Sequence, residues 1–143
     1  MYLTKSEVEA IVRTLEHGDG THFWSRVSPD VNWTIMGNSP AAGTYNSLAE
    51  LSANTLQKLS KVLDGQPLKF KVRSLIIGGE NGEWSTLEIQ AHGRTKNGKE
   101  FDHEYVLVMK WSEEGKVVLV RDYLDSALLN RIFEENGGYK ADE

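Results

Sequence analysis

The second half of the chain carries the pattern that most restricts its fold: apolar and polar residues alternate in four consecutive segments separated by short turns. Alternation with a period of two is typical of strands, because successive side chains of a strand point to opposite faces of a sheet. The separating stretches GGENG, KNGK and SEEGK are rich in the residues that hairpin turns need. The sequence therefore predicts an antiparallel meander with strands at about 68–78, 84–96, 100–111 and 117–124.

The first half of the chain shows helical spacing of its apolar residues instead. A capping box, formed either by Thr4 with Glu7 or by Ser6 with Glu9, begins the first helix. Asp125 is in a position to cap the last helix. The other predicted helices lie at 4–17, about 21–27, 46–63 and about 125–135, and DGQP at 64–67 ends the third of them. The sequence also predicts a turn at Pro29 and Asp30, a half-buried strand through Val31, Trp33 and Ile35, a loop NSPAAGTYN before the long helix, and a frayed tail at 136–143.

This order of elements predicts an α+β layout in a single domain that covers residues 1–143. One apolar face of the meander must be covered, and the early helices are available to cover it. A strongly curved, mostly antiparallel sheet wrapped around N-terminal helices leaves a cone-shaped pocket at its helix-closed end. Both faces of the strands carry apolar residues, so we also expect a homodimer that packs through the outer face of the sheet.

Composition excludes several classes of protein. The formal net charge is −5 and there is no long basic run, which argues against nucleic-acid and anionic-membrane partners. The chain has no cysteine, so disulfides, thiolate metal sites and cysteine catalysis are excluded. His17, His22 and His92 show no metal-ligand spacing, and we expect no metal site. No apolar run is as long as a membrane span, and the start MYLTKSEVEA lacks the apolar core of a signal peptide, so a cytoplasmic location is expected.

Four segments in this order suggest a family: VSPDVNW, PAAGTY, FDHEYVLV and GKVVLVRDYLD. Together with the order of elements, they resemble the SnoaL-like branch of the nuclear transport factor two / ketosteroid isomerase superfamily over essentially the whole chain. The resemblance implies a cone-shaped α+β barrel with a cystatin-like layout. This fold carries isomerases, cyclases, dehydratases, epoxide hydrolases and non-catalytic binders, so the resemblance alone does not decide between them.

Two activities of the superfamily are disfavoured at the matching positions. The two carboxyl groups of ketosteroid isomerases fall on Ile35 and Leu107, and their tyrosine falls on Ile11. The arginine and second aspartate of limonene epoxide hydrolase fall on Ile89 and Ala91. Aliphatic side chains neither take up a proton nor stabilise an oxyanion. The chain is therefore not expected to be a standard ketosteroid isomerase or limonene epoxide hydrolase.

The remaining acid of the pattern is Asp122, which matches the base of SnoaL-type polyketide cyclases. In an apolar pocket its pKa would rise toward neutrality, as a general base requires. His103 or Tyr105 could donate a hydrogen bond to a developing enolate. The plainer alternatives stay open at this point: Asp122 as an exposed residue or a partner of Arg94, and His103 as a residue that only holds Asp102 in place.

The resemblance also implies which side chains form the pocket, with Val118, Val120, Asp122 and Leu124 facing inward from the last strand. The expected ligand is small and largely apolar, and no cofactor is expected. Three hypotheses follow: a cofactor-free cyclase or isomerase that uses Asp122 and His103, a binding module without chemistry, and a dimer with a structural role only. The expected ligand-binding residues are Trp24, Trp33, Ile35, Tyr45, Leu87, Ile89, Tyr105, Leu107, Met109 and Val120.

Overall fold

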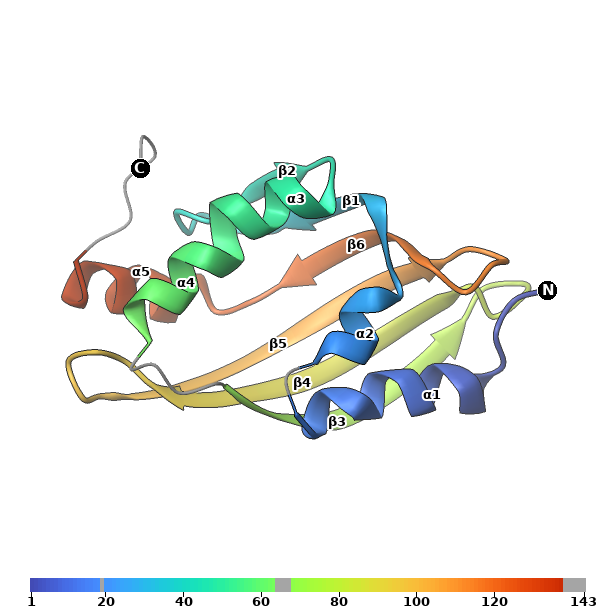
Figure 1. Cartoon of the computed structure of the whole chain (residues 1–143), viewed down its shortest axis with the longest axis horizontal. Coiled ribbons are helices and arrows are strands. Elements are labelled where there is room, and N and C mark those ends of the chain that lie inside the picture. Colours follow the sequence, from blue (N-terminus) through green and yellow to red (C-terminus); the bar gives the residue numbers. More distant parts are fainter. Residues whose placement is uncertain (19, 64–67, 138–143) are drawn as a thin grey trace.

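The computed structural model describes residues 1–18, 20–63 and 68–137. Its centre is a six-stranded sheet with the order β2-β1-β6-β5-β4-β3 (Figure 1). Neighbouring strands are antiparallel except β1 and β6, which run parallel. The strands are β1 (Val27–Ile35), β2 (Gly43–Tyr45), β3 (Lys69–Gly78), β4 (Trp84–Arg94), β5 (Glu100–Trp111) and β6 (Val117–Tyr123). The predicted α+β class and the four-strand meander are confirmed.

The helices cover one face of this sheet, as Figure 1 shows. The helix α1 continues into a 3₁₀ turn, and α3 and α4 are joined through a π-helical turn, so residues 48–62 form one continuous rod. The main core lies between the sheet and the early helices, and a second apolar cluster joins α4, β5 and α5. The helical elements are α1 (Lys5–Arg13) with its 3₁₀ turn (Thr14–Glu16), α2 (Thr21–Ser25), α3 (Leu48–Leu51), the π turn (Ser52–Leu56), α4 (Gln57–Val62) and α5 (Ser126–Glu135).

The capping box of α1 uses the first of the two predicted pairs. The Thr4 side chain accepts a hydrogen bond from the backbone N–H of Glu7 at 3.2 Å, and the Glu7 carboxylate accepts one from the N–H of Thr4 at 3.1 Å. The two bonds satisfy N–H groups that have no partner within the helix. The buried side of α1 then carries Val8, Ile11 and Val12, which fixes this helix against the sheet.

The predicted turn at Pro29 and Asp30 is wrong, because β1 runs without a break from Val27 to Ile35. Its pairing with β6 shifts register between Val27 and Asn32. Proline cannot donate to a strand ladder, but it is tolerated where a bulge interrupts the ladder. Pro29 and Asp30 are exposed within that bulge, so they bend the strand instead of ending it.

Two smaller predictions also need correction. The segment expected to be a plain loop before the long helix contains β2, which pairs with β1 from Trp33↔Tyr45 to Ile35↔Gly43. Val118 was expected to face inward from β6, but Val117, which is 0% exposed, occupies the core in its place. The reason is a shift in the register between β5 and β6 next to Trp111. The segment expected to end the long helix, 64–67, and most of the tail expected to fray, 138–143, lie outside the described residues.

Candidate functional site

A cavity of about 150 Å³ opens between the inner face of the sheet and the helices. Its walls come from α2, β1, the π turn, α4, the strands β3 to β6 and α5, so segments from the whole length of the chain meet there. Five of the expected catalytic and ligand-binding residues line it, Trp24, Ile35, His103, Tyr105 and Asp122, and so does Leu124, which was expected to face inward. Apart from Thr55, the remaining described wall residues are apolar. They include Leu59, Phe70, Phe101, Leu129 and Phe133.

Asp122 is held near the end of β6, between Ile35 of β1 and Leu107 of β5. Its side chain is only 7% exposed. The Trp33 indole N–H donates to its Oδ2 atom at 3.3 Å. Its Oδ1 atom is buried and has no hydrogen-bond partner among the described residues. The residue therefore presents a carboxyl group that only one donor satisfies.

The electrostatic surroundings of Asp122 favour its protonated form. Burial raises the pKa of this carboxyl group from 3.8 to about 7, and the hydrogen bond from Trp33 lowers it in part. Arg94 does not compensate the charge, since its guanidinium donates to the carbonyl of Gly98 at an exposed hairpin. The two plainer alternatives for Asp122, an exposed position and a pair with Arg94, are thus both wrong.

His103 connects β5 to the start of α5. Its Nε2 atom accepts a hydrogen bond from the backbone N–H of Asp125 at 3.2 Å. The Asp125 carboxylate in turn caps α5 through the N–H of Leu128 at 3.0 Å, as predicted. Burial lowers the pKa of His103 to about 4, against a raising effect of Asp125, so the ring is neutral at pH 7. A neutral ring that accepts at Nε2 carries its proton on Nδ1, the atom left to donate.

Tyr105 stands beside His103 on the same face of β5. The two rings stack with centroids 5.0 Å apart. Burial and the negative charge of Asp122 both raise the pKa of the Tyr105 hydroxyl, which therefore stays a hydrogen-bond donor at any physiological pH. The alternative role for His103 as the partner of Asp102 is wrong, because His92 pairs with Asp102 at 2.8 Å.

Trp33 lies behind the cavity wall. Its ring stacks on that of Trp24 with centroids 5.6 Å apart and an interplanar angle of 20°. Trp24 lines the cavity, whereas Trp33 contacts the carboxyl group of Asp122. Trp33 thus orients Asp122 and donates a hydrogen bond to it. The sequence had predicted only that Trp33 would contact the ligand.

The other expected ligand-binding residues are buried away from the cavity. Tyr45 donates its hydroxyl proton to the carbonyl of Ala41 at 2.6 Å, and the rest belong to the main core. They lie on the inner face of the sheet, as expected, but none of them lines the cavity. These core residues are Leu87, Ile89, Leu107, Met109 and Val120.

Part of the wall was not anticipated because it comes from helices that close over the sheet. Leu129 and Phe133 are four positions apart on α5, a spacing that predicts one shared face but not what that face covers. Thr55 lies in the π turn, and such turns are frequent at functional sites. The apolar periodicity of these helices is the signal that was available in the sequence.

In the described part of the chain, no group of three or more His, Asp or Glu side chains is arranged to hold a metal ion. None of the helices found there has both the length and the apolar character needed to cross a membrane.

No family model matches the chain. Two curated relatives do match: the dimerizing cyclase phiC of a fungal species is 27% identical over 94% of this chain, and the dimerizing cyclase tstC of Talaromyces stipitatus is 29% identical over 76% of it. The matched regions make up 59% and 48% of those two proteins, so the chain spans about half the length of the curated relatives it matches.

Among solved structures, an NTF2-like (nuclear transport factor two-like) protein of Burkholderia thailandensis is similar over 87% of this chain and 92% of its own, with a TM-score of 0.68 and 25% identity. The chain has an NTF2-like fold. The resemblance to the nuclear transport factor two / ketosteroid isomerase superfamily is therefore confirmed.

Proposed function

We propose that this NTF2-like chain catalyses a cyclase-type reaction on a small, largely apolar carbonyl compound, with Asp122 as the general base. The observation that carries the proposal is the carboxyl group of Asp122, buried in an apolar cavity without a cationic partner among the described residues. With a pKa of about 7, this group is present in both protonation states at neutral pH. It can therefore accept a proton and later return it.

The reaction would proceed in steps that need no external oxidant or reductant. The Asp122 carboxylate removes a proton from a carbon next to a carbonyl group, and the electron pair of that C–H bond moves toward the carbonyl oxygen to form an enolate. The enolate carbon then attacks a second electrophilic carbon, which forms a C–C bond and leaves a new oxyanion or enolate. The protonated Asp122 returns its proton to that product.

Tyr105 and His103 are the donors that stand near this reaction. The Tyr105 hydroxyl and the Nδ1–H of His103 belong to side chains that line the cavity beside Asp122. Hydrogen bonds from such fixed donors favour the negative charge that develops on the substrate oxygen. His103 would act here as a neutral donor and not as the base, since its Nε2 atom is engaged with Asp125.

The comparisons support the type of reaction. Both curated relatives are named as cyclases, and they are similar to this chain over most of its length. The aliphatic residues Ile11, Ile35 and Leu107 stand where the resemblance places the polar groups of ketosteroid isomerases, and all three are buried. These residues argue against an isomerase of that kind. They favour a cyclase in which a single carboxylate transfers the proton.

Hydrogen–deuterium exchange tests the base directly. Cyclopentanone in D₂O is a compact carbon acid about the size of benzene, which a cavity of about 150 Å³ can hold, and NMR measures the loss of its α-protons. We expect faster exchange with the wild-type protein than with Asp122→Asn, by a factor on the order of 10²–10⁴. Equal exchange rates with both proteins would contradict the assignment of Asp122.

Binding without chemistry is the second candidate, favoured by the same loss of polar groups at Ile11, Ile35 and Leu107. Native mass spectrometry of the protein purified from its own host separates the two. A bound metabolite that is recovered unchanged after long incubation favours a binding module. Its conversion to a product by the wild-type protein but not by Asp122→Asn favours the enzyme.

We also propose that two copies associate through the outer face of the sheet. Ile76 is 60% exposed and Tyr123 is 44% exposed on this face. The half-buried side chains of Val106 and Val108 lie between them, in rows set by the pairing of β3 through β6. Exposed apolar side chains that lie together on a sheet are typical of a protein interface.

A further inference from the structure

The cavity contains one acidic side chain and, among the described residues that line it, no lysine or arginine. The titratable groups that face it together with Asp122 are His103 and Tyr105, both on β5. The walls from β1, β3, β4, α2, the π turn, α4 and α5 contribute uncharged side chains. When Asp122 is ionised, the cavity therefore has a negative charge that no neighbouring cation compensates.

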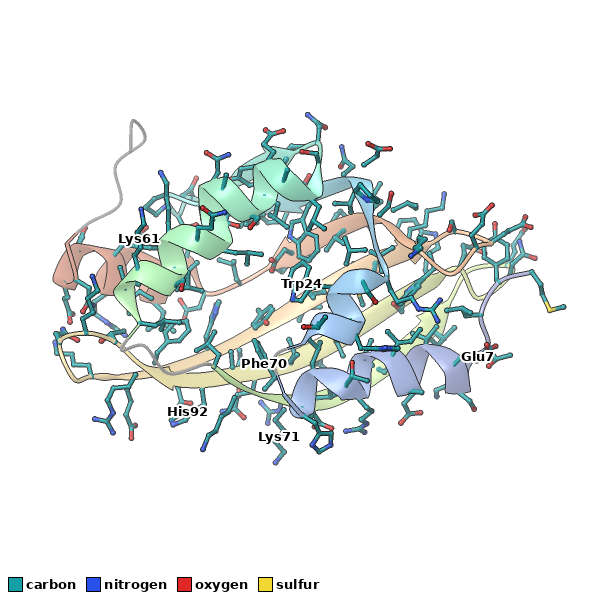
Figure 2. All side chains as sticks on the ribbon, viewed as in Figure 1. Glu7, Trp24, Lys61, Phe70, Lys71 and His92 are labelled. Atoms are coloured by element: carbon teal, nitrogen blue, oxygen red, sulfur yellow. The ribbon has the colours of Figure 1, made fainter. Side chains whose placement is uncertain are left out.

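Aromatic rings form much of the wall around this carboxyl group. Figure 2 shows two of them, Trp24 on α2 and Phe70 on β3, on the helix-covered side of the sheet. Phe101 and Tyr105 come from β5, and Phe133 comes from α5. The faces of aromatic rings attract cations through their quadrupole, and this attraction is stronger where water is excluded.

We propose that the cavity binds a small alkylammonium ion, tertiary or quaternary, with Asp122 as its counter-ion and the surrounding aromatic rings as its cage. Alkyl groups on the nitrogen match apolar walls, whereas a primary ammonium would leave N–H donors without acceptors. A cavity of about 150 Å³ is the size that holds a single benzene ring. Ligands such as tetramethylammonium or choline fit within this limit.

Binding of the cation should be coupled to ionisation of Asp122. Burial disfavours the carboxylate in the empty cavity, with a pKa of about 7, and an ammonium ion supplies the missing opposite charge. The affinity should therefore fall about tenfold per pH unit below pH 7 and level off above it. His103 has a pKa of about 4 and Tyr105 a pKa above its ordinary value, so neither changes its charge between pH 5 and pH 8.

This inference concerns binding and goes beyond the proposed cyclase reaction. The ammonium ion would occupy the space beside the base and act as a competitor of any carbonyl substrate. The two proposals can also fail separately. Deuterium exchange of cyclopentanone tests the base, whereas cation selectivity is measured at equilibrium without turnover.

A pair of isosteric ligands tests the proposal: choline, which is a cation, and 3,3-dimethylbutan-1-ol, which has the same shape without the charge. Binding to the full chain is followed by calorimetry and by the indole N–H resonance of Trp33 in NMR spectra. At pH 8 we expect choline to bind at least tenfold more tightly than the neutral alcohol. Between pH 8 and pH 5 the affinity for choline should fall about a hundredfold, and that for the alcohol should stay constant.

Asp122→Asn is the deciding variant, because it keeps the size of the side chain and removes the charge. It should lose the preference for choline, while unchanged binding of the neutral alcohol shows that the cavity is still formed. The proposal is overturned by equal affinities of the wild-type protein for both ligands, by a preference that persists in Asp122→Asn, or by no binding of choline at millimolar concentration.

Discussion

Replacing Asp122 by asparagine should make the protein more stable at alkaline pH, although the substitution is made inside the cavity. In the folded protein the pKa of this carboxyl group is about 7, whereas 3.8 is its ordinary value and applies to the unfolded chain. Below pH 3.8 the group is protonated in both states. Between these two pH values the unfolded chain releases a proton that the folded protein keeps, so the free energy of unfolding falls as the pH rises.

The magnitude follows from the size of the shift. One pKa unit corresponds to about 1.4 kcal/mol, so the shift from 3.8 to about 7 corresponds to a loss of about 4 kcal/mol above pH 7. The asparagine side chain of the variant does not ionise, and it keeps an oxygen that can accept the hydrogen bond from Trp33. The stability difference between Asp122→Asn and wild type should thus be near zero at pH 4, rise by about 1.4 kcal/mol per pH unit, and level off near pH 7.

Urea-induced unfolding at a series of pH values, followed by circular dichroism, measures this difference. Titration of all other groups affects both proteins and cancels in the comparison. Asp30→Asn, which removes a carboxyl group from an exposed position on β1, controls for the loss of one charge. A difference between Asp122→Asn and wild type that does not change with pH would refute the argument, since it would mean that the Asp122 carboxyl group is solvated or paired.

Three further predictions concern two residues of this site and the outer face of the sheet. Trp33→Phe removes a hydrogen bond that lowers the pKa of Asp122, so the midpoint of its carboxyl ¹³C titration should move to higher pH; an unchanged midpoint would contradict the role of Trp33 as a positioning residue. His103→Leu leaves the N–H of Asp125 without its acceptor and should cost about 1–3 kcal/mol at pH 7. Burial lowers the pKa of His103 from 6.5 to about 4, so the contribution of this residue to stability should be lost as the pH falls from 6.5 to 4, opposite in sign to that of Asp122. The stability difference between wild type and the leucine variant should therefore shrink over this range. Val108→Lys should convert a dimer to monomers in analytical ultracentrifugation while Val108→Thr does not; identical sedimentation of both variants would contradict the proposed interface.

Local patterns in the sequence were sufficient to predict most of the sheet. The period of two and the glycine-containing turns locate β3 to β6 within a few residues, because both signals act over short distances. Pro29 was misread for the same reason: only the pairing with β6 shows that it lies in a bulge and not in a turn. The strand β2 has three residues and is too short for any period to appear.

The candidate site was predictable only in part. The inward orientation of Asp122 follows from strand alternation once the fold is expected, and the structure places it there. Which inward residues line a cavity and which fill the core depends on where the helices rest on the sheet. Met109 and His103 both face inward from β5, yet Met109 is packed in the core and His103 lines the cavity. No short-range pattern distinguishes these two outcomes.

The hydrogen bond between Trp33 and Asp122 joins residues that are 89 positions apart. During synthesis, β1 leaves the ribosome long before β6 exists, and until then it has only the short strand β2 beside it. Contacts between such distant segments form late in folding, because a long loop must close before they can be made. A chain that stops just before β6 would thus contain most of the residues that line the cavity but not Asp122, so the buried carboxyl group is added only with the last strand of the sheet.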